Sequence, residues 1–255
     1  MKLNYKITLF FIITCFPLAF SQDFIYPTKG IDKVEITSRV SVILKTHNYS
    51  NILISNKENK RVKKAAFGLK STFGKDNTGF NVYVEQDNSI LKIESFHPRT
   101  EDDLIIYLPE NIKIFAEIIN NNDITISDFR NEIEAKTNNG DIKIENVNGP
   151  VIIENSNGNT FLKFNEVNQN YPMSIINSHG DIDITLLENT KANLEISVPR
   201  GDLYTDLELT TIEKQEKGLD AYEKRDSRYI KSKLNDGGVN ITIVSSRGNV
   251  YLRKK

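Results

Sequence analysis

The amino-acid sequence predicts an all-β fold, a β-solenoid or β-helix-like stack of short strands with about 18–22 residues per coil and two charged insertions. The first observation is a recurring corner, in which a glycine is followed by Asp or Asn and then by a short β-branched segment. The corner glycines are Gly140, Gly158, Gly180 and Gly201, with a late copy at Gly248. A fixed period of this size is typical of repeat architectures, in which each repeat is one supersecondary unit.

The second observation is a strict alternation of apolar and polar residues after each corner, as in Ile142 and Ile144. This alternation places one side of each strand in a core and the other in water. A single unit cannot fold alone, because the entropy lost in ordering it exceeds what a few buried aliphatic side chains return. The units are therefore expected to stack and share one core. The patterns of leucine-rich repeats and of nine-residue calcium-binding repeats are absent.

Residues 1–21 are typical of a secretory signal peptide. Two lysines precede an apolar run at 7–16, and Ala19-Phe20-Ser21 forms a small-x-small cleavage site that would leave Gln22 as the mature N-terminus. A membrane-anchoring helix is the alternative, but ten apolar residues are too few to span a bilayer. Cys15 lacks the small neighbours that lipidation requires. The chain is therefore expected to be exported, to the periplasm, the outer membrane or the extracellular space.

Removal of the signal peptide would leave a nearly neutral chain without cysteine. Residues 1–21 contain two lysines and no acidic residue, so 31 of the 33 basic residues and all 34 acidic residues remain, a net charge of −3. This balance gives no support for nucleic-acid binding. No second apolar run is long enough for a transmembrane segment. Residues 22–255 show no linker and are expected to form a single domain.

Strands are expected on both sides of a first charged insertion. Alternating segments lie at 34–37, 40–44 and 52–54, and again at 80–84, 90–93, 104–108 and 112–114. The insertion between them holds seven cations, and they form a candidate binding site for an anionic ligand: Lys57, Lys60, Arg61, Lys63, Lys64, Lys70 and Lys75. A solvated loop is the simpler interpretation of the same segment.

The repeats then run from about 120 to 209, and a second charged insertion at 211–233 shows no strand alternation and is expected to be a loop or a short helix. Strands at 239–243 and 250–252 close the chain. The basic residues 253–255 would blunt the exposed edge of a last strand at the end of the stack.

A search for catalytic chemistry finds little. The three histidines, His47, His97 and His179, occur singly, and no metal-ligand spacing, nucleophile elbow or phosphate-binding glycine loop is present. His179 occupies the corner slot that holds Asn139 in a sister repeat, which indicates a turn residue. The sequence predicts no catalytic residue, no metal and no cofactor.

The corner carboxylates Asp123, Asp141, Asp181 and Asp202 would form a row if the coils stack in register. Such a row could bind calcium or supply the acid–base pair of a glycan-cleaving enzyme. Turn chemistry is favoured, because equivalent positions hold Asn159 and Asn249 and because both residue types bond local backbone in tight turns. The expected structural turn residues are Gly140, Asp141, Gly158, Gly180, Asp181, Gly201, Asp202 and Gly248.

Three segments resemble the putative-adhesin family of bacterial secreted proteins, which is otherwise classed as a domain of unknown function. They are 139–151 (NGDIKIENVNGPV), 180–186 (GDIDITL) with 191–194 (KANL), and 234–239 (LNDGGV) followed by 248–254 (GNVYLRK). The N-terminal strands fit the same pattern, so the resemblance covers nearly all of 30–254. It implies an all-β, β-helix-like fold and an envelope location, and it brings no catalytic residues. The chain departs from the family pattern at Ser178-His179 and Pro199-Arg200.

These observations lead to the hypothesis of a non-enzymatic, secreted binding or scaffold protein of the cell envelope, with an envelope polysaccharide or an envelope protein as its partner. A glycan-active enzyme that uses the stacked corner carboxylates is one alternative. An envelope-stress accessory protein that binds a membrane partner is another.

Overall fold

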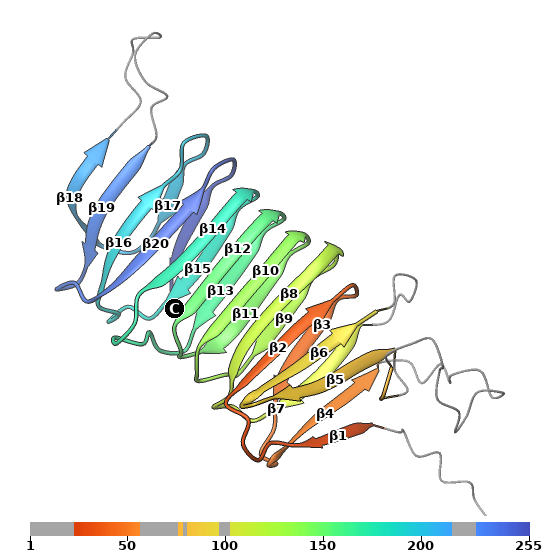
Figure 1. The fold of residues 1–255 in the computed structure, drawn as a ribbon. Helices are drawn as coiled ribbons and strands as arrows, with labels where there is room; N and C mark the ends of the chain where they lie inside the picture. The colour runs from red at the N-terminus through yellow and green to blue at the C-terminus, as the bar shows by residue number, and fades with distance from the viewer. Residues whose placement is uncertain (1–22, 57–75, 79–80, 97–102, 216–227) are drawn as a thin grey trace, which may run out of the picture.

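A computed structural model describes residues 23–56, 76–78, 81–96, 103–215 and 228–255. These residues form two long, mostly parallel β-sheets that face each other (Figure 1), which confirms the predicted solenoid-like all-β stack. In spatial order, sheet A contains β1 (Phe24–Pro27), β4 (Asn51–Asn56), β7 (Leu104–Leu108), β3 (Val42–Thr46), β9 (Ile124–Ser127), β11 (Ile142–Val147), β13 (Thr160–Phe164), β15 (Ile182–Leu186), β21 (Val250–Lys254) and β17 (Leu203–Thr205).

Sheet B has eleven strands within the described residues. In spatial order they are β18 (Leu209–Gln215), β19 (Tyr229–Leu234), β16 (Ala192–Ser197), β20 (Val239–Ser245), β14 (Met173–His179), β12 (Val151–Asn157), β10 (Ile133–Asn139), β8 (Lys113–Asn121), β2 (Lys33–Ser38), β6 (Ile90–Ser95) and β5 (Val82–Asp87). One strand from each sheet makes one coil, so that β10 and β11 form a coil and β12 and β13 form the next.

The core lies between the sheets and is built from aliphatic ladders. Ile126, Ile144, Leu162, Ile184 and Leu252 are successive register partners on sheet A, and all are at most 2% exposed. Sheet B contributes matching rows of Ile and Val from its inner face. The predicted alternation is therefore the alternation between this core and the solvent.

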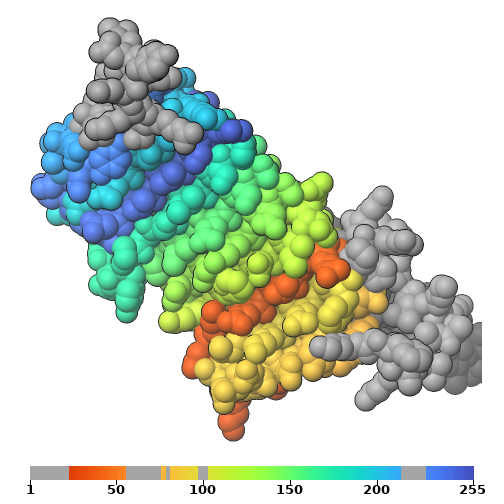
Figure 2. All heavy atoms as spheres, turned by 45° about the horizontal axis from the view of Figure 1, so that its top comes forward, coloured from red at the N-terminus to blue at the C-terminus, as the bar shows by residue number. Residues whose placement is uncertain are grey.

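The coils at the two ends of the stack are not in chain order. At the N-terminal end, β2 pairs with β6 on one side and with β8 on the other, so the coil β6–β7 lies outside the coil β2–β3. At the C-terminal end, β20 lies between β14 and β16. Figure 2 shows both exchanges as colour steps: orange β2 lies between yellow β6 and yellow-green β8, and dark-blue β20 lies between β14 and light-blue β16.

Antiparallel strands cover the ends of the stack. Strand β5 pairs with β6, and β4 pairs with β7 and carries β1 on its far side. At the other end, β19 pairs with β16 and with β18, so sheet B ends in a hairpin. These strands satisfy the backbone groups of the terminal parallel strands, which an open edge would leave unpaired.

Two sequence expectations are corrected by this arrangement. The second insertion was expected to be a loop or helix, but its described parts, up to Gln215 and from Arg228 onward, contribute to β18 and β19. Alternation is weak there because β18 packs against the core only through Leu209, whereas Ile212 is 56% exposed. The basic C-terminal residues were expected at an end of the stack, but β21 lies inside sheet A between β15 and β17.

The predicted signal peptide lies outside the described residues, as does the basic insertion 57–75. Among the residues that the structure does describe, no helix is long and apolar enough to cross a membrane.

Candidate functional site

The corner glycines stack on one another so closely that no side chain fits. A Cβ atom on Gly158 would lie 2.1 Å from the carbonyl oxygen of Gly140, and one on Gly180 would lie 2.0 Å from that of Gly158. Both residues also have φ values, +132° and +119°, that L-amino acids with side chains rarely adopt. Gly201 and Gly248 stack in the same way at the C-terminal end of the column. The recurring glycine is thus required by coil-on-coil contact.

The corner carboxylates form the expected row, and each is engaged by the next coil. The Asp123 carboxylate accepts the backbone N–H of Asp141 at 2.8 Å, and that of Asp141 accepts the N–H of Asn159 at 2.7 Å. Asn159 and Asp181 continue the chain of bonds toward Asn249. The last member, Asp202, accepts from the guanidinium of Arg228. This arrangement explains why both Asp and Asn occur at these positions, since either side chain supplies the accepting oxygen.

A second polar column lies just inside the corner. Asn155 and Asn177 are buried, and each donates its amide N–H to the carbonyl oxygen of a corner glycine in the preceding coil, at 3.1 Å in both cases. The Asn177 side-chain oxygen accepts the Thr160 hydroxyl at 2.8 Å. The equivalent oxygen of Asn155 has no partner, because Ile142 stands where Thr160 stands in the next coil. These side chains hold the corners together and are not open to a ligand.

The described histidines serve local structure. His47 Nε2 is 2.7 Å from the carbonyl oxygen of Asn51. His179 occupies the expected corner slot, where its Nε2 accepts from Arg247 at 3.0 Å. His97 lies outside the described residues. Within the described part of the chain, no group of three or more His, Cys, Asp or Glu side chains is placed to hold a metal ion.

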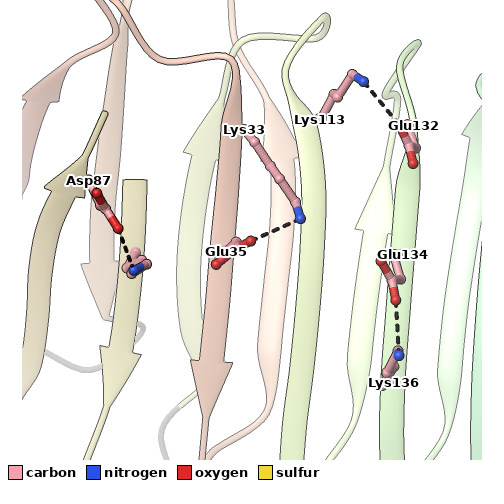
Figure 3. Close-up of polar contacts among 8 residues, drawn as sticks. Lys33, Glu35, Asp87, Lys113, Glu132, Glu134 and Lys136 are labelled. Carbon is pink, nitrogen blue, oxygen red and sulfur yellow. Dashed lines mark hydrogen bonds and ion pairs between the residues drawn. The ribbon is translucent and has the colours of Figure 1, made fainter. Parts of the chain in front are cut away.

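The outer face of sheet B is a lattice of mutually paired charges (Figure 3). Lys33 bonds Glu35 at 2.9 Å, and Lys113 lies 3.2 Å from Glu132. Lys136 lies 3.0 Å from Glu134, and this hydrogen bond raises the pKa of the Lys136 ammonium above its ordinary value. The pKa values of Lys92 and Lys231 are raised in the same way, by Asp87 and Glu195. Because the charges neutralise one another, this face offers little to a charged ligand.

The outer face of sheet A is different over its C-terminal half, where aromatic side chains are exposed. Phe161, Asp183, Tyr251 and Tyr204 are successive register partners on β13, β15, β21 and β17. Phe161 is 41% exposed and Tyr204 is 52% exposed. The Tyr204 and Tyr251 rings stack with their centroids 5.2 Å apart. The row therefore presents aromatic surface in a line along the axis of the stack.

A parallel row on the same face carries charge. Lys163, Thr185 and Arg253 are register partners on β13, β15 and β21. Together with Phe161 and Asp183 they line a shallow groove of about 360 Å³. The groove is also lined by Lys143, Glu145 and Leu162. This groove, with the Tyr251–Tyr204 stack at its end, is called the aromatic groove below.

The side chain of Arg253 is fixed within the aromatic groove. Its Nε lies 2.9 Å from both carboxylate oxygens of Asp183, and its guanidinium carbon lies 5.4 Å from the centre of the Tyr251 ring. Its two terminal nitrogens make no hydrogen bond with the described residues. Lys163 also has no ion-pair partner there, whereas Lys143 is paired with Glu145 at 3.1 Å. The groove thus holds one positioned guanidinium and one unpaired ammonium.

A second hollow at the N-terminal end is a weaker candidate. It is lined by loop residues that include His47, Tyr49 and Glu110, and Tyr49 is 70% exposed. The His47 ring contacts Tyr49 and Tyr107 at centroid distances of 5.5 and 6.2 Å. The His47 ring bonds the Asn51 carbonyl oxygen and the Glu110 carboxylate is paired with Arg130, so this hollow offers fewer free groups than the aromatic groove.

Of the site residues expected from the sequence, the seven basic residues at 57–75 lie outside the described residues, and the expected turn residues lie at the stacked corners. The aromatic groove was not anticipated. One signal could have pointed to it: Phe161 occupies a position that is polar in the neighbouring strands β9, β11 and β15, where Thr125, Lys143 and Asp183 stand.

Comparison with known proteins gives one family match and two structural similarities. Residues 119–242 match the family model described as Toastrack DUF4097, which confirms the resemblance to a family classed as a domain of unknown function. A putative cell adhesion protein from Clostridium sporogenes aligns at 12% identity and a TM-score of 0.40, over 91% of this chain and 99% of that one. A putative adhesin from Bacteroides fragilis aligns at 12% identity and a TM-score of 0.39, over 91% and 96%. No curated protein matches the chain.

Proposed function

We propose that the protein, whose residues 119–242 match the Toastrack family model, is a non-enzymatic, exported binding or scaffold protein of the cell envelope. Its partner is an envelope polysaccharide or an envelope protein. The observation that carries this proposal is the aromatic groove: it combines exposed aromatic rings with the positioned Arg253 guanidinium and with the Lys163 ammonium, which has no ion-pair partner among the described residues. Exposed patches of this kind on an otherwise self-paired surface are typical of interaction sites.

The use of the corner carboxylates supports a binding protein over a glycan-active enzyme. Glycosidase catalysis needs one free carboxylate and one protonated carboxyl group on opposite sides of the scissile bond. The described corner acids instead accept backbone N–H groups or the Arg228 guanidinium, so their oxygens face neighbouring coils. We therefore expect no turnover of polysaccharides by this protein, and release of reducing ends from a panel of glycans would contradict the proposal.

Co-sedimentation tests the proposed function directly. The purified protein is mixed with peptidoglycan, outer-membrane vesicles or surface polysaccharide at low and at high salt, and the bound fraction is measured. Binding to one fraction is expected, and it should weaken at high salt because cations contribute to the contact. Absence of binding to every fraction would contradict the proposal and would direct the search to a soluble partner.

The basic insertion provides a separate prediction. Charge reversal of Lys57, Lys60, Arg61, Lys63, Lys64, Lys70 and Lys75 is expected to weaken attachment to the same fraction, because these cations would add long-range attraction to an anionic surface. Charge reversal of Lys33 and Lys113, which lie on the self-paired face of sheet B, is the control. Unaltered attachment would remove the insertion from the binding surface.

A further inference from the structure

The aromatic groove repeats one pair of side chains. Strand β13 presents Phe161 and, two residues later, Lys163, while β21 presents Tyr251 and Arg253 in the same two rows. Strand β15 lies between them, so the two pairs are separated by two strand spacings, about 9.5 Å. Each pair sets a ring beside a positive charge. The second ring, Tyr251, is stacked on Tyr204 with centroids 5.2 Å apart and has the Arg253 guanidinium carbon 5.4 Å from its centre. A ligand that satisfies both pairs must itself repeat an apolar face and a negative charge along its length.

The charges in the groove favour an anion. The ion pairs Lys143–Glu145 and Asp183–Arg253 are internally neutral, which leaves Lys163 as a net positive charge. The bond to Asp183 uses Nε of Arg253 and leaves its two terminal nitrogens unbonded among the described residues. A guanidinium of this kind suits the planar carboxylate group, which it can bind through two parallel hydrogen bonds.

The sheet itself argues against an extended peptide. Strands β13, β15 and β21 are hydrogen-bonded on both sides, to β11 and β17 at the limits of the groove. An added peptide strand would need a free strand edge for its main chain, and the face of the groove provides none. A ligand there is held by side chains alone, through ring stacking and charge. Pyranose rings, which carry apolar C–H faces and can carry a carboxylate at C5, meet both requirements.

We propose that the aromatic groove binds an unbranched acidic polysaccharide of uronic-acid units, lying along the axis of the stack with sugar rings against the exposed Phe161 and Tyr204 rings and carboxylates on Lys163 and Arg253. The proposal rests on the proposed function, since it names the ligand class of that binding surface. The Tyr251 ring supports the exposed Tyr204 ring by stacking on it. Asp183 and Thr185 line the floor between the two pairs and accept or donate hydrogen bonds to hydroxyl groups.

The test measures the affinity of the purified protein for polygalacturonate by isothermal titration calorimetry at low salt. Dextran serves as the neutral glycan, dextran sulfate as the sulfated glycan and poly-glutamate as the acidic peptide. Polygalacturonate is expected to bind at least tenfold more tightly than each of the other three. Equal or tighter binding of dextran, dextran sulfate or poly-glutamate would overturn the proposed ligand class, as would no binding of polygalacturonate.

Matched variants locate the site. Phe161→Ala and Lys163→Gln are each expected to raise the Kd for polygalacturonate about tenfold, the size of effect that interface anchors show. Ile176→Ala is the control for the first, because Ile176 is a 37% exposed residue on the outer face of sheet B. Lys45→Gln is the control for the second, because Lys45 is an exposed residue on β3 of sheet A, outside the groove. Unchanged affinity in both groove variants would overturn the proposal.

Two further measurements keep the outcomes separate. Thermal unfolding of each variant shows whether it still folds. The variant Arg253→Lys keeps the positive charge but lacks the guanidinium's paired N–H donors, and its affinity for polygalacturonate is expected to fall several fold. Binding to an envelope fraction without binding to polygalacturonate would overturn this ligand class and leave the proposed function standing. Failure of both experiments would overturn the proposed function itself.

Discussion

At the scale of single residues, the stack is held by contacts between equivalent atoms of successive coils. A corner glycine meets the carbonyl oxygen of the corner glycine before it, and a corner carboxylate accepts the N–H of the corner residue after it. Each contact is made with the neighbouring coil, so one substitution affects two coils. The same residue types therefore recur in the sequence because each one contacts its equivalent in the neighbouring coil.

The corner glycines give the first prediction. Gly158→Ala is expected to destabilise the protein by more than about 3 kcal/mol, because the new methyl group would overlap the Gly140 carbonyl and the backbone would be strained. Gly30→Ala is the control: its φ is also positive, at +80°, but the nearest atom lies 4.0 Å away, so a cost of about 1 kcal/mol is expected. Urea unfolding of both variants measures the difference, and equal costs would contradict the role of close stacking.

The buried asparagines Asn155 and Asn177 give the second prediction. Asn177→Ala should cost about 3 kcal/mol, because it removes the partner of the Thr160 hydroxyl and the side-chain donor to the Gly158 carbonyl oxygen. The Asp181 carbonyl oxygen also loses a donor but keeps the Thr160 backbone N–H. Asn155→Ala should cost about 1 kcal/mol less, because the side-chain oxygen of Asn155 has no partner to lose. The free energies of unfolding of the two variants test this order. A larger loss for Asn155→Ala would show that the two positions are held differently.

At the scale of elements, the spatial order of the coils differs from their order in the chain at both ends of the stack. Strands β20 and β21 arrive last but lie between the coils β14–β15 and β16–β17. Figure 1 shows the C-terminus beside the stack, away from its end. The final strands thus fill an interior position, and the end of the stack is left to an earlier segment and its hairpin.

This exchange predicts the order of local stability. Amide protons of Val250 and Leu252, which are 0% and 1% exposed and lie inside sheet A, should exchange more slowly than those of the edge strand β17. A stack in simple chain order would give the reverse, because the last strand would then be an edge. Native-state hydrogen exchange followed by mass spectrometry distinguishes the two, and fast exchange at 250–252 would contradict the structure.

The sequence allows the repeated coils to be predicted but not their order at the ends. Alternation and corner glycines identify strands such as 142–147, because these properties are local. The order of parallel strands depends on which exposed strand edge a later segment pairs with. Coils of the same repeat expose edges with the same pattern of residues, so the sequence does not distinguish them. For the same reason the contact of Arg253 with Asp183, 70 residues apart, could not be anticipated. The aromatic groove is missed because its residues come together only when β21 lies beside β15.

At the scale of the whole molecule, the stack presents two outer faces with different chemistry. On sheet B, neighbouring lysines and glutamates neutralise each other, and two cations, Lys33 and Lys136, lie over the ring of Phe115. On sheet A, the aromatic groove leaves rings and charges available along the axis of the stack. A rigid scaffold with one such face is well suited to a long ligand, because successive coils add contacts without further ordering of the protein.

Hydroxyl-radical footprinting of the protein with and without its bound envelope fraction tests whether sheet A carries the binding surface. Aromatic side chains react readily with these radicals in proportion to their exposure, so each reports on its own location. We expect protection of Phe161 and Tyr204 in the complex, with no change at Tyr49 and Tyr171, which are 70% and 62% exposed at other sites. Protection of Tyr49 or Tyr171 while Phe161 and Tyr204 stay reactive would contradict the account.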